Sequence, residues 1–172
     1  MTDYIVLADA KTWITANILD VANWSIATDA QKQIALNQAM DHIDNLILSG
    51  VKVDTSQVRE FPRCFYSESG EPWWFYENMD YLFRGAGWYC QSEVPQQVKD
   101  ATCYEAVEII NHFLDVGKKD RLELQRQGVL SIKEADVSEN YRPFAGNRYR
   151  DLISKDAQRL LKRYMGTHVQ TI

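Results

Sequence analysis

Two pairs of acidic residues have a spacing that could support chemistry. Asp41 and Asp44, and likewise Glu105 and Glu108, stand three positions apart in segments with helical periodicity, so each pair lies on one face of a helix. Paired carboxylates of this kind can bind a metal or act as general acid and base. Neither pair is joined to an ExxH motif or a glycine-rich loop. We therefore interpret Asp41 and Asp44 as part of a solvated helix face.

The short motifs that mark common catalytic or nucleotide-binding sites are missing from the sequence. It contains no GxxxxGK[ST], GxGxxG, GxSxG or HExxH. We predict that the protein is not an enzyme and uses no cofactor. A small hydrolase or lyase with a site in the aromatic-rich segment 51–93 is an alternative, but that segment offers no nucleophile–base pair.

The cysteines and histidines are too scattered to predict a metal site. Cys64, Cys90 and Cys103 include no CxxC, and the three histidines do not pair at helical spacing. We expect buried, reduced thiols and solvated histidines rather than a disulfide framework, because cytosolic thiols are normally reduced. The start of the chain has no basic segment followed by an apolar one, so we expect no secretory signal and folding in the cytoplasm.

Charge is distributed unevenly along the 172 residues. Residues 1–116 contain 7 Lys/Arg and 17 Asp/Glu, whereas residues 117–172 contain 12 Lys/Arg and 7 Asp/Glu. An acidic body with a basic C-terminal part suits a protein whose ends meet complementary surfaces. The basic part could equally fold back on its own body. The net charge of −5 does not favour nucleic acid as a partner.

Apolar periodicity predicts a mainly α fold. We expect a short helix over 8–18, a connection containing Trp24, and a longer helix over 28–48, which begins with a Thr28/Gln31 capping box and ends before Gly50. A third helix is predicted over 95–116, with Glu105 close to its apolar stripe and in need of a partner such as an arginine. Ile43 and Ile109 should lie in the core. The polar face of the 28–48 helix, expected to be solvated, carries Lys32, Asp41, His42 and Asp44.

Residues 51–93 have no long helical period and are predicted to form a long aromatic-rich loop. Four aromatic residues are consecutive, so no single helix or strand face can bury all of them. They could fold over the helices, or they could contact another subunit or a tail protein, where such side chains are favoured. The candidates for these subunit or tail contacts are Trp73, Trp74, Phe75 and Tyr76.

The C-terminal part is predicted to be an extended arm that ends in a helix. Residues 128–141 alternate loosely, which suits an arm or hairpin, and a basic helix begins near Ser154. We therefore divide the chain into a helical bundle domain at 1–116, which contains the loop at 51–93, and an arm with a C-terminal helix at 117–172. No apolar run approaches the roughly 20 residues that span a bilayer, so we expect no membrane partner.

The order of several short motifs resembles a known family. These motifs are Ala8-Asp9-Ala10 with Trp13, the capped segment 31–44, Phe61-Pro62-Arg63, Val94-Pro95 with the helix that follows, the segment 128–141 and the final basic helix. Together they resemble the head–tail connector adaptor proteins of tailed bacteriophages, a family that includes sequences labelled DnaT-like. The resemblance covers nearly the whole chain. Compared with the family, residues 64–93 look like an insertion, and Ala135 stands where a glycine is frequent.

The resemblance implies a structural virion protein of the phage neck. Its members form a ring, typically of twelve copies, beneath the portal protein, and the ring extends the DNA channel toward a tail or head-completion protein. Double-stranded DNA would pass through without specific binding. The alternative is a single-stranded-DNA-binding replication accessory protein. Arginines suit bidentate pairing with portal carboxylates, and the candidate contacts are Arg142, Arg148, Arg150, Arg159 and Arg163.

Overall fold

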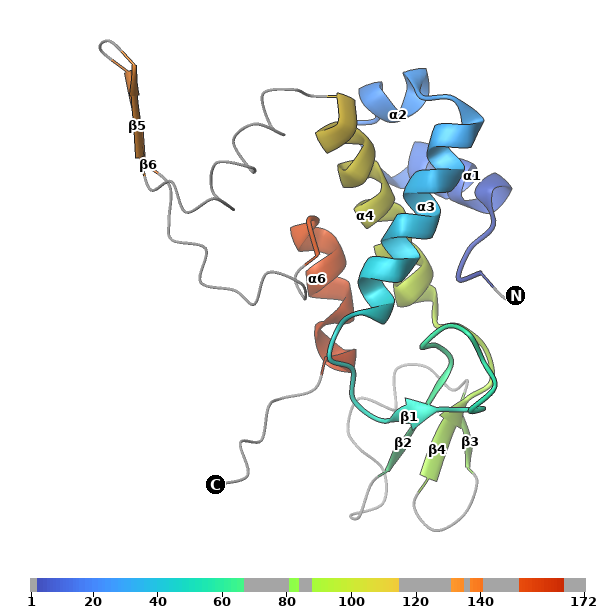
Figure 1. Ribbon diagram of the computed structural model, residues 1–172. Coiled ribbons are helices and arrows are strands. Elements are labelled where there is room, and N and C mark those ends of the chain that lie inside the picture. The colour runs from blue at the N-terminus through green and yellow to red at the C-terminus, as the bar shows by residue number, and fades with distance from the viewer. Residues whose placement is uncertain are drawn as a thin grey trace.

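The computed structural model is mainly helical with a small antiparallel sheet, which confirms the predicted fold class (Figure 1). It describes residues 3–66, 81–83, 88–114, 131–134, 137–140 and 152–165, with the backbone alone described for 81–83, 131–134 and 137–140. Among these residues, none of the helices is long and apolar enough to cross a membrane.

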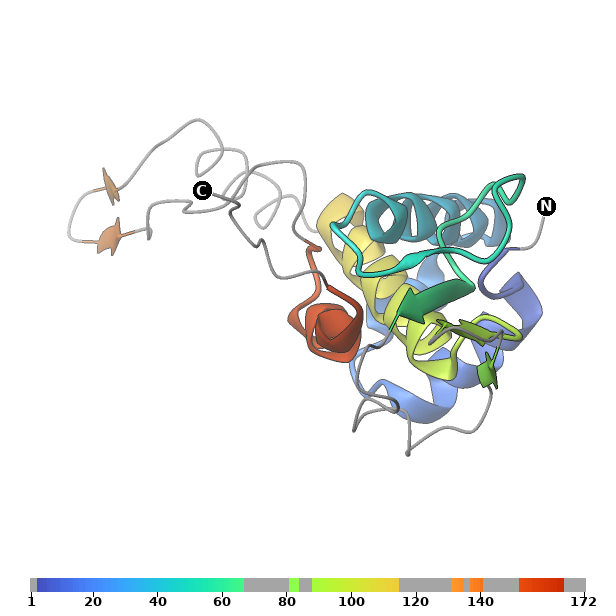
Figure 2. The same ribbon diagram turned by 90° about the horizontal axis from the view of Figure 1, so that it is seen from below.

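Helix α4 lies at the centre of the helical part. It spans Gln96–Leu114 and contacts α1 (Leu7–Asn17), α2 (Ala22–Ile26), α3 (Asp29–Asp44) and α6 (Lys155–Leu161). A 3-10 turn, η2 (Lys162–Tyr164), continues α6. Seen from below, α6 lies on one side of α4 and α1 lies on the other (Figure 2). The basic C-terminal helix and the N-terminal helix therefore occupy opposite sides of the bundle.

Helix α3 begins where the local sequence signals predicted. Thr28 Oγ1 accepts a hydrogen bond from the Gln31 amide at 3.3 Å, and Gln31 Oε1 accepts one from the Thr28 amide at 2.8 Å. This is the expected capping box. The helix ends at Asp44 rather than Leu48, because the chain then turns toward the sheet. Gly50, with a φ of 74°, makes that turn where a side chain would collide with the Cys64 carbonyl oxygen.

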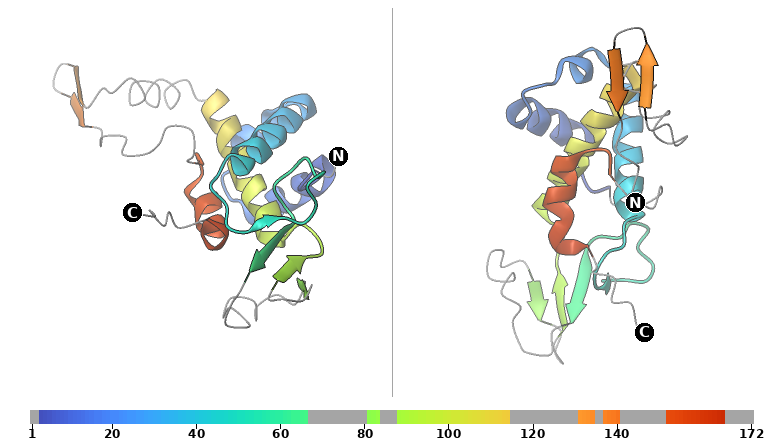
Figure 3. Two further views of the ribbon diagram at one scale, coloured as in Figure 1. Left: turned by 60° about the horizontal axis from the view of Figure 1, so that its bottom comes forward. Right: turned by 90° about the vertical axis from the view of Figure 1, so that its left-hand side faces the viewer.

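Four antiparallel strands lie within the segment that was predicted to be a loop, so that prediction was wrong. They are β1 (Val51–Lys52), β2 (Arg63–Tyr66), β3 (Tyr81–Phe83) and β4 (Trp88–Gln91), in the order β1-β2-β4-β3. Each strand has at most four residues, which is too short to show a period of two above the surrounding sequence. The sheet lies at one end of the helical bundle (Figure 3).

A disulfide joins Cys64 on β2 to Cys90 on β4, contrary to the expectation of free thiols. The sheet register places these two residues directly opposite each other. The two cysteines are 26 positions apart and form no recognisable sequence motif. Their pairing therefore depends on the topology of the strands. Cys103, in contrast, is a free and fully buried thiol, as predicted.

The buried apolar side chains form two clusters. One lies between α1, α2, α3 and α4, and it includes Ile14, Trp24 and Leu36. The other joins α3, α4, the sheet and the C-terminal helix. Ile43 is fully buried in it, as predicted, whereas Ile109 is only partly buried at the edge of the first cluster. The C-terminal residues of the second cluster are Leu152, Ala157, Leu161 and Tyr164.

Strands β5 (Ser131–Glu134) and β6 (Val137–Asn140) form an antiparallel hairpin, which matches the prediction for residues 128–141. Ser131 is opposite Asn140, and Glu134 is opposite Val137. The hairpin lies apart from the helical bundle (Figures 1 and 3).

Candidate interaction surfaces

All five cations of residues 3–66 are engaged by groups of the same chain. Lys11 pairs with Asp29 at 2.6 Å, and Lys52 pairs with Glu60 at 3.1 Å. Lys32 is buried, with its ammonium 5.7 Å from the centre of the Trp24 ring. The two arginines, Arg59 and Arg63, pair with carboxylates as well. Since Lys32 was expected to be solvated, the structure corrects that interpretation.

Arg59 links the end of α3 to the loop before β2. One of its terminal nitrogens donates to Asp41 at 2.5 Å and to Asp44 at 2.9 Å. The Tyr4 hydroxyl also donates to Asp44, and its oxygen accepts a hydrogen bond from the Glu60 amide. Burial, aided by Asp44, raises the pKa of Tyr4. The side chain of Asp44 is only 19% exposed, whereas that of Asp41 is 63% exposed. The expectation of a solvated face therefore holds for Asp41 and is wrong for Asp44, and both carboxylates belong to the ion-pair network of Arg59.

Arg63 explains the Phe61-Pro62-Arg63 motif in structural terms. Its side chain is 6% exposed, and its guanidinium donates to the carbonyl oxygens of Ser49 and Gly50, each at 2.7 Å. It also pairs with Glu60. These two carbonyl groups lie in the turn between α3 and β1. They therefore have no hydrogen-bond partner in a helix or a sheet ladder. A planar guanidinium can satisfy several such acceptors at once.

Glu105 is fully buried and holds the C-terminal helix against α4. Its Oε1 accepts from His42 Nδ1 at 2.8 Å and from the Ile153 amide at 3.0 Å. Its Oε2 accepts from the Ser154 amide at 2.9 Å, at the start of α6. An arginine was expected as the partner of Glu105, and the structure corrects this. The donors are a histidine and two backbone amides, which no sequence pattern links to Glu105.

The outer face of α6 and η2 carries exposed cations. Ala157, Leu161 and Tyr164 are buried against the body, and the Ser49 amide donates to the Tyr164 carbonyl at 2.7 Å. The opposite side of this segment faces outward. We call it the basic helix face, and its exposed members are Lys155, Arg159, Lys162 and Arg163.

The predicted portal contacts are only partly described by the structure. Arg159 and Arg163 lie on the basic helix face, where Arg159 pairs with Asp156 at 2.7 Å. Arg142, Arg148 and Arg150 lie outside the described residues. The same holds for the candidate subunit or tail contacts, Trp73, Trp74, Phe75 and Tyr76.

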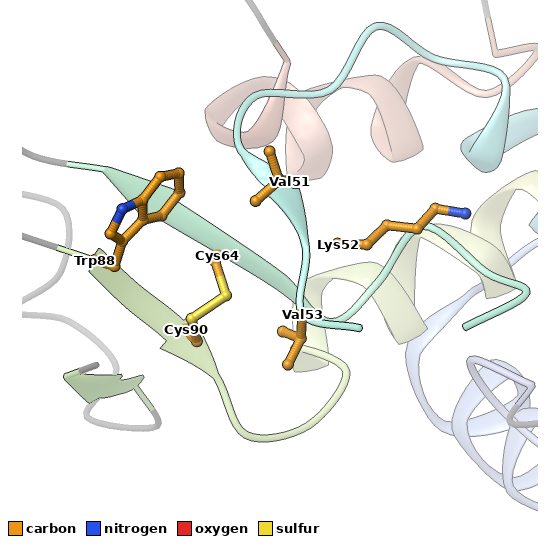
Figure 4. Close-up of a pocket in the computed structure, with 6 residues that line it drawn as sticks. All are labelled: Val51, Lys52, Val53, Cys64, Trp88 and Cys90. Atoms are coloured by element: carbon orange, nitrogen blue, oxygen red, sulfur yellow. A yellow bond between two sulfur atoms is a disulfide. The ribbon is translucent and has the colours of Figure 1, made fainter. Parts of the chain in front are cut away.

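The outer face of the sheet is an apolar surface that sequence reasoning missed. Tyr66 is opposite Trp88 in the register, and their rings lie 5.3 Å apart. Val51 and Tyr66 are half exposed. A shallow hollow of about 280 Å³ lies on this face, as Figure 4 shows, and the disulfide lies between Trp88 and the valines of the β1 segment. The hollow is lined by Val51, Lys52, Val53, Cys64, Trp88 and Cys90.

Within the described residues, no group of three or more His, Cys, Asp or Glu side chains could hold a metal ion. His112 has a buried Nδ1 without a hydrogen-bond partner in that part of the chain. It was expected to be solvated, and its partial burial on α4 corrects that expectation.

A family model described as "Putative DnaT-like ssDNA binding protein" matches residues 3–75. The match covers α1, α2, α3 and the first two strands, which is less than half of the chain. No curated protein and no solved structure matches.

Proposed function

We propose that this protein is a structural adaptor of the head–tail connector of a tailed bacteriophage. In this role it forms a ring, typically of twelve copies, beneath the portal protein and extends the DNA channel toward a tail or head-completion protein. Its place is the virion neck, and it is made in the host cytoplasm. The order of motifs along the chain supports this proposal, as does the mainly helical fold.

The observation that carries the proposal is that the cations of residues 3–75 already have partners within the chain. This segment contains five Lys/Arg and ten Asp/Glu. Each of the five cations is engaged within the chain, by a carboxylate, by backbone carbonyls or by the Trp24 ring. A protein gains affinity for single-stranded DNA by presenting Lys and Arg to phosphates beside aromatic stacking platforms. A segment whose cations are already paired is better suited to a structural role.

An acidic body also suits a wall or flank of a DNA channel. Negative charge repels phosphates, so that double-stranded DNA moves past the protein without specific binding. Three aspartates of the segment 3–20, which contains α1, are exposed: Asp3, Asp9 and Asp20. They fit this role because the described structure pairs them with no cation.

The basic helix face is the part of the described surface that fits an acidic portal. The Glu105 contacts fix the orientation of α6, and Arg159 and Arg163 therefore point outward from a rigid support. In our proposal they pair with portal carboxylates together with Arg142, Arg148 and Arg150. Such pairing sets the register of docking and raises the association rate more than it adds affinity.

Single-stranded-DNA binding in a replication accessory role is the second candidate, and the description of the matching family model favours it. The two candidates predict different titrations. A DNA-binding protein binds a fluorescent oligonucleotide tightly, and its affinity falls steeply as the salt concentration rises. An adaptor binds the portal and shows weak oligonucleotide binding at physiological salt.

The test of portal docking compares two variants with the same change in charge. Arg159→Glu with Arg163→Glu reverses the basic helix face, and Lys11→Glu with Lys99→Glu reverses two cations elsewhere. We expect the first variant to associate with purified portal rings at least tenfold more slowly, and the second to associate at a rate within about twofold of the unchanged protein. Equal binding by both variants would overturn the docking proposal.

Point variants are preferable to truncation in this test. A chain that ends at residue 116 would lack Leu152, Leu161 and Tyr164, which belong to the core. It would also leave Glu105 buried without the two amides that it accepts. Loss of portal binding by such a chain would therefore report unfolding. Absence of the protein from purified virions, measured by mass spectrometry, would remove the adaptor proposal entirely.

A further inference from the structure

The two cysteines of the sheet lie on the face opposite to the one that packs on the helical bundle. Cys64 and Cys90 are paired across β2 and β4, on the same face as Tyr66 and Trp88. The neighbouring side chains on the other face, Phe65 and Tyr89, belong to or pack against the core. The disulfide is therefore on the outer face of the sheet, and the packing that holds the strands on the bundle does not depend on it.

We infer that Cys64 and Cys90 are a redox-modified pair: two thiols in the reducing cytosol where the chain folds, and a disulfide after the protein reaches an oxidising medium. The chemistry of the pair stands on the sheet geometry alone. Its biological setting, in which virions leave a reducing cell, rests on the proposed function.

Access to the pair comes from the hollow on the outer face. Cys64 and Cys90 are 6% and 2% exposed, yet both line the hollow of about 280 Å³ (Figure 4). Thiol–disulfide exchange requires that a small thiol or disulfide reaches a sulfur atom. Cys103 provides the contrast, because it is fully buried between helices and burial raises the pKa of its thiol to about 12. Oxidation should therefore select Cys64 and Cys90 over Cys103.

Oxidised glutathione, or another low-molecular-weight disulfide, supplies the oxidant. The thiolate of one cysteine attacks a sulfur of oxidised glutathione, which forms a mixed disulfide and releases one reduced glutathione. The thiolate of the second cysteine attacks the protein sulfur of that mixed disulfide, forms the Cys64–Cys90 bond and releases a second reduced glutathione. The two cysteines lose two electrons and two protons, and one molecule of oxidised glutathione takes them up and becomes two molecules of reduced glutathione.

The bond would stabilise the protein because it closes a loop between β2 and β4 in the unfolded chain. The two cysteines are 26 positions apart. Closing a loop of this length typically raises the melting temperature of a small domain by on the order of 10 °C. The neck would thus become more resistant to unfolding after release from the cell.

The first experiment uses the full-length purified protein in a series of glutathione buffers, from fully reduced to fully oxidised. Free thiols are trapped by alkylation, and peptides are identified by mass spectrometry. We expect one intramolecular bond, Cys64–Cys90, with Cys103 alkylated only after denaturation, and a melting temperature that is higher in the oxidised form. Another pairing, intermolecular dimers, or a melting temperature independent of redox state would each overturn the inference.

Two variants separate the effect of the bond from other effects of the buffer. Cys64→Ser with Cys90→Ser should abolish the difference in melting temperature between reduced and oxidised protein, and Cys103→Ser should retain it. Should the serine pair fold poorly, Cys64→Ala with Cys90→Ala serves the same purpose. A redox-dependent shift that survives in the double variant would contradict the inference.

The biological setting is tested separately, by alkylation trapping in infected cells and in released virions. We expect thiols at Cys64 and Cys90 inside cells and the disulfide in released particles. A disulfide already complete inside cells would overturn the switch while leaving the adaptor proposal intact. If the protein is absent from virions, the adaptor proposal fails, and the result on purified protein still decides the chemistry.

Discussion

His42 Nδ1 lies 2.8 Å from Oε1 of Glu105, although the two residues are 63 positions apart and on different helices. The same carboxylate accepts the Ile153 and Ser154 amides at the start of α6. One buried side chain therefore connects α3, α4 and the C-terminal helix. Since carboxylates only accept hydrogen bonds, His42 must carry a proton on Nδ1 in this arrangement.

Replacing Glu105 should release the C-terminal helix. Glu105→Ala leaves two backbone amides and a histidine without their acceptor, and we expect a loss of about 3 kcal/mol in the free energy of unfolding. Hydrogen exchange of the α6 amides should become faster than that of α3. Glu108→Ala is the matched control, on the same helix but partly exposed, and should change stability by less than about 0.5 kcal/mol. Unchanged protection of α6 in Glu105→Ala would show that apolar packing alone holds the helix.

Local signals predicted the longer helices well, because those signals lie within a few residues of the feature they produce. They missed α2, since the segment around Trp24 was expected to be a connection and forms a short helix. Thr28 and Gln31 form the capping box that their spacing indicates, and Ser154 caps α6 by accepting the Ala157 amide at 3.3 Å. The sheet and its disulfide could not be predicted in this way, since they join strands far apart in sequence. The partner of Glu105 was missed for the same reason, as its amide donors come from 48 and 49 positions away.

For the candidate surfaces, the sequence predicted only the kinds of residue present and not which of them are exposed. A count of charges showed that the C-terminal part is basic, but it could not show that α6 buries Leu161 while it exposes Arg159 and Arg163. Likewise, Lys32 looked like a solvated residue, and its burial over Trp24 depends on how α2 packs against α3. These outcomes are set by tertiary packing rather than by local pattern.

The two isoleucines predicted to be in the core should now respond differently. Ile43 is fully buried and Ile109 is partly buried. Ile43→Asp places an unpaired charge in the core and should cost more than about 4 kcal/mol, enough to unfold the protein. Ile109→Asp can turn its carboxylate toward water, so we expect a loss of about 1–2 kcal/mol. Chemical denaturation measures both, and equal losses would contradict the burial difference.

Arg63→Lys should be strongly destabilising although it conserves charge. A lysine ammonium cannot reach the carbonyl oxygens of Ser49 and Gly50 together with Glu60. We expect a loss of about 2–3 kcal/mol in the free energy of unfolding. Arg159→Lys, at an exposed pair, is the control and should be neutral within about 0.5 kcal/mol. A neutral Arg63→Lys would mean that water can replace the guanidinium in this turn.

The Cys103 thiol should make the protein less stable at high pH. Burial, with a contribution from Asp100, raises the pKa of this thiol from its ordinary value of 9.0 to about 12 in the folded state. Between these values the unfolded chain loses the proton and the folded chain keeps it, so ionisation favours unfolding. The penalty should grow by about 1 kcal/mol for each pH unit above 9.

Cys103→Ala removes this ionisation, and comparison with the unchanged protein cancels the titration of tyrosines and lysines. Any cavity cost of the substitution is independent of pH. Urea denaturation at pH 8 and at pH 10.5 should therefore show the unchanged protein losing more stability than the variant as the pH rises. Parallel losses in the two proteins would mean that water reaches the thiol in the folded state.

We expect the aromatic run of residues 73–76 to act in assembly, and its members are Trp73, Trp74, Phe75 and Tyr76. Four consecutive aromatic side chains cannot all point to one side of a helix or strand. If some of them form a contact with another subunit or a tail protein, Trp73→Ala with Trp74→Ala should leave the melting temperature of the monomer within about 2 °C, since aromatic anchors act at the interface. Virions made with this variant should have unstable necks and yield heads without tails, which electron microscopy would count. A large fall in monomer stability, with normal assembly of the protein that remains folded, would instead assign these residues to the protein's own core.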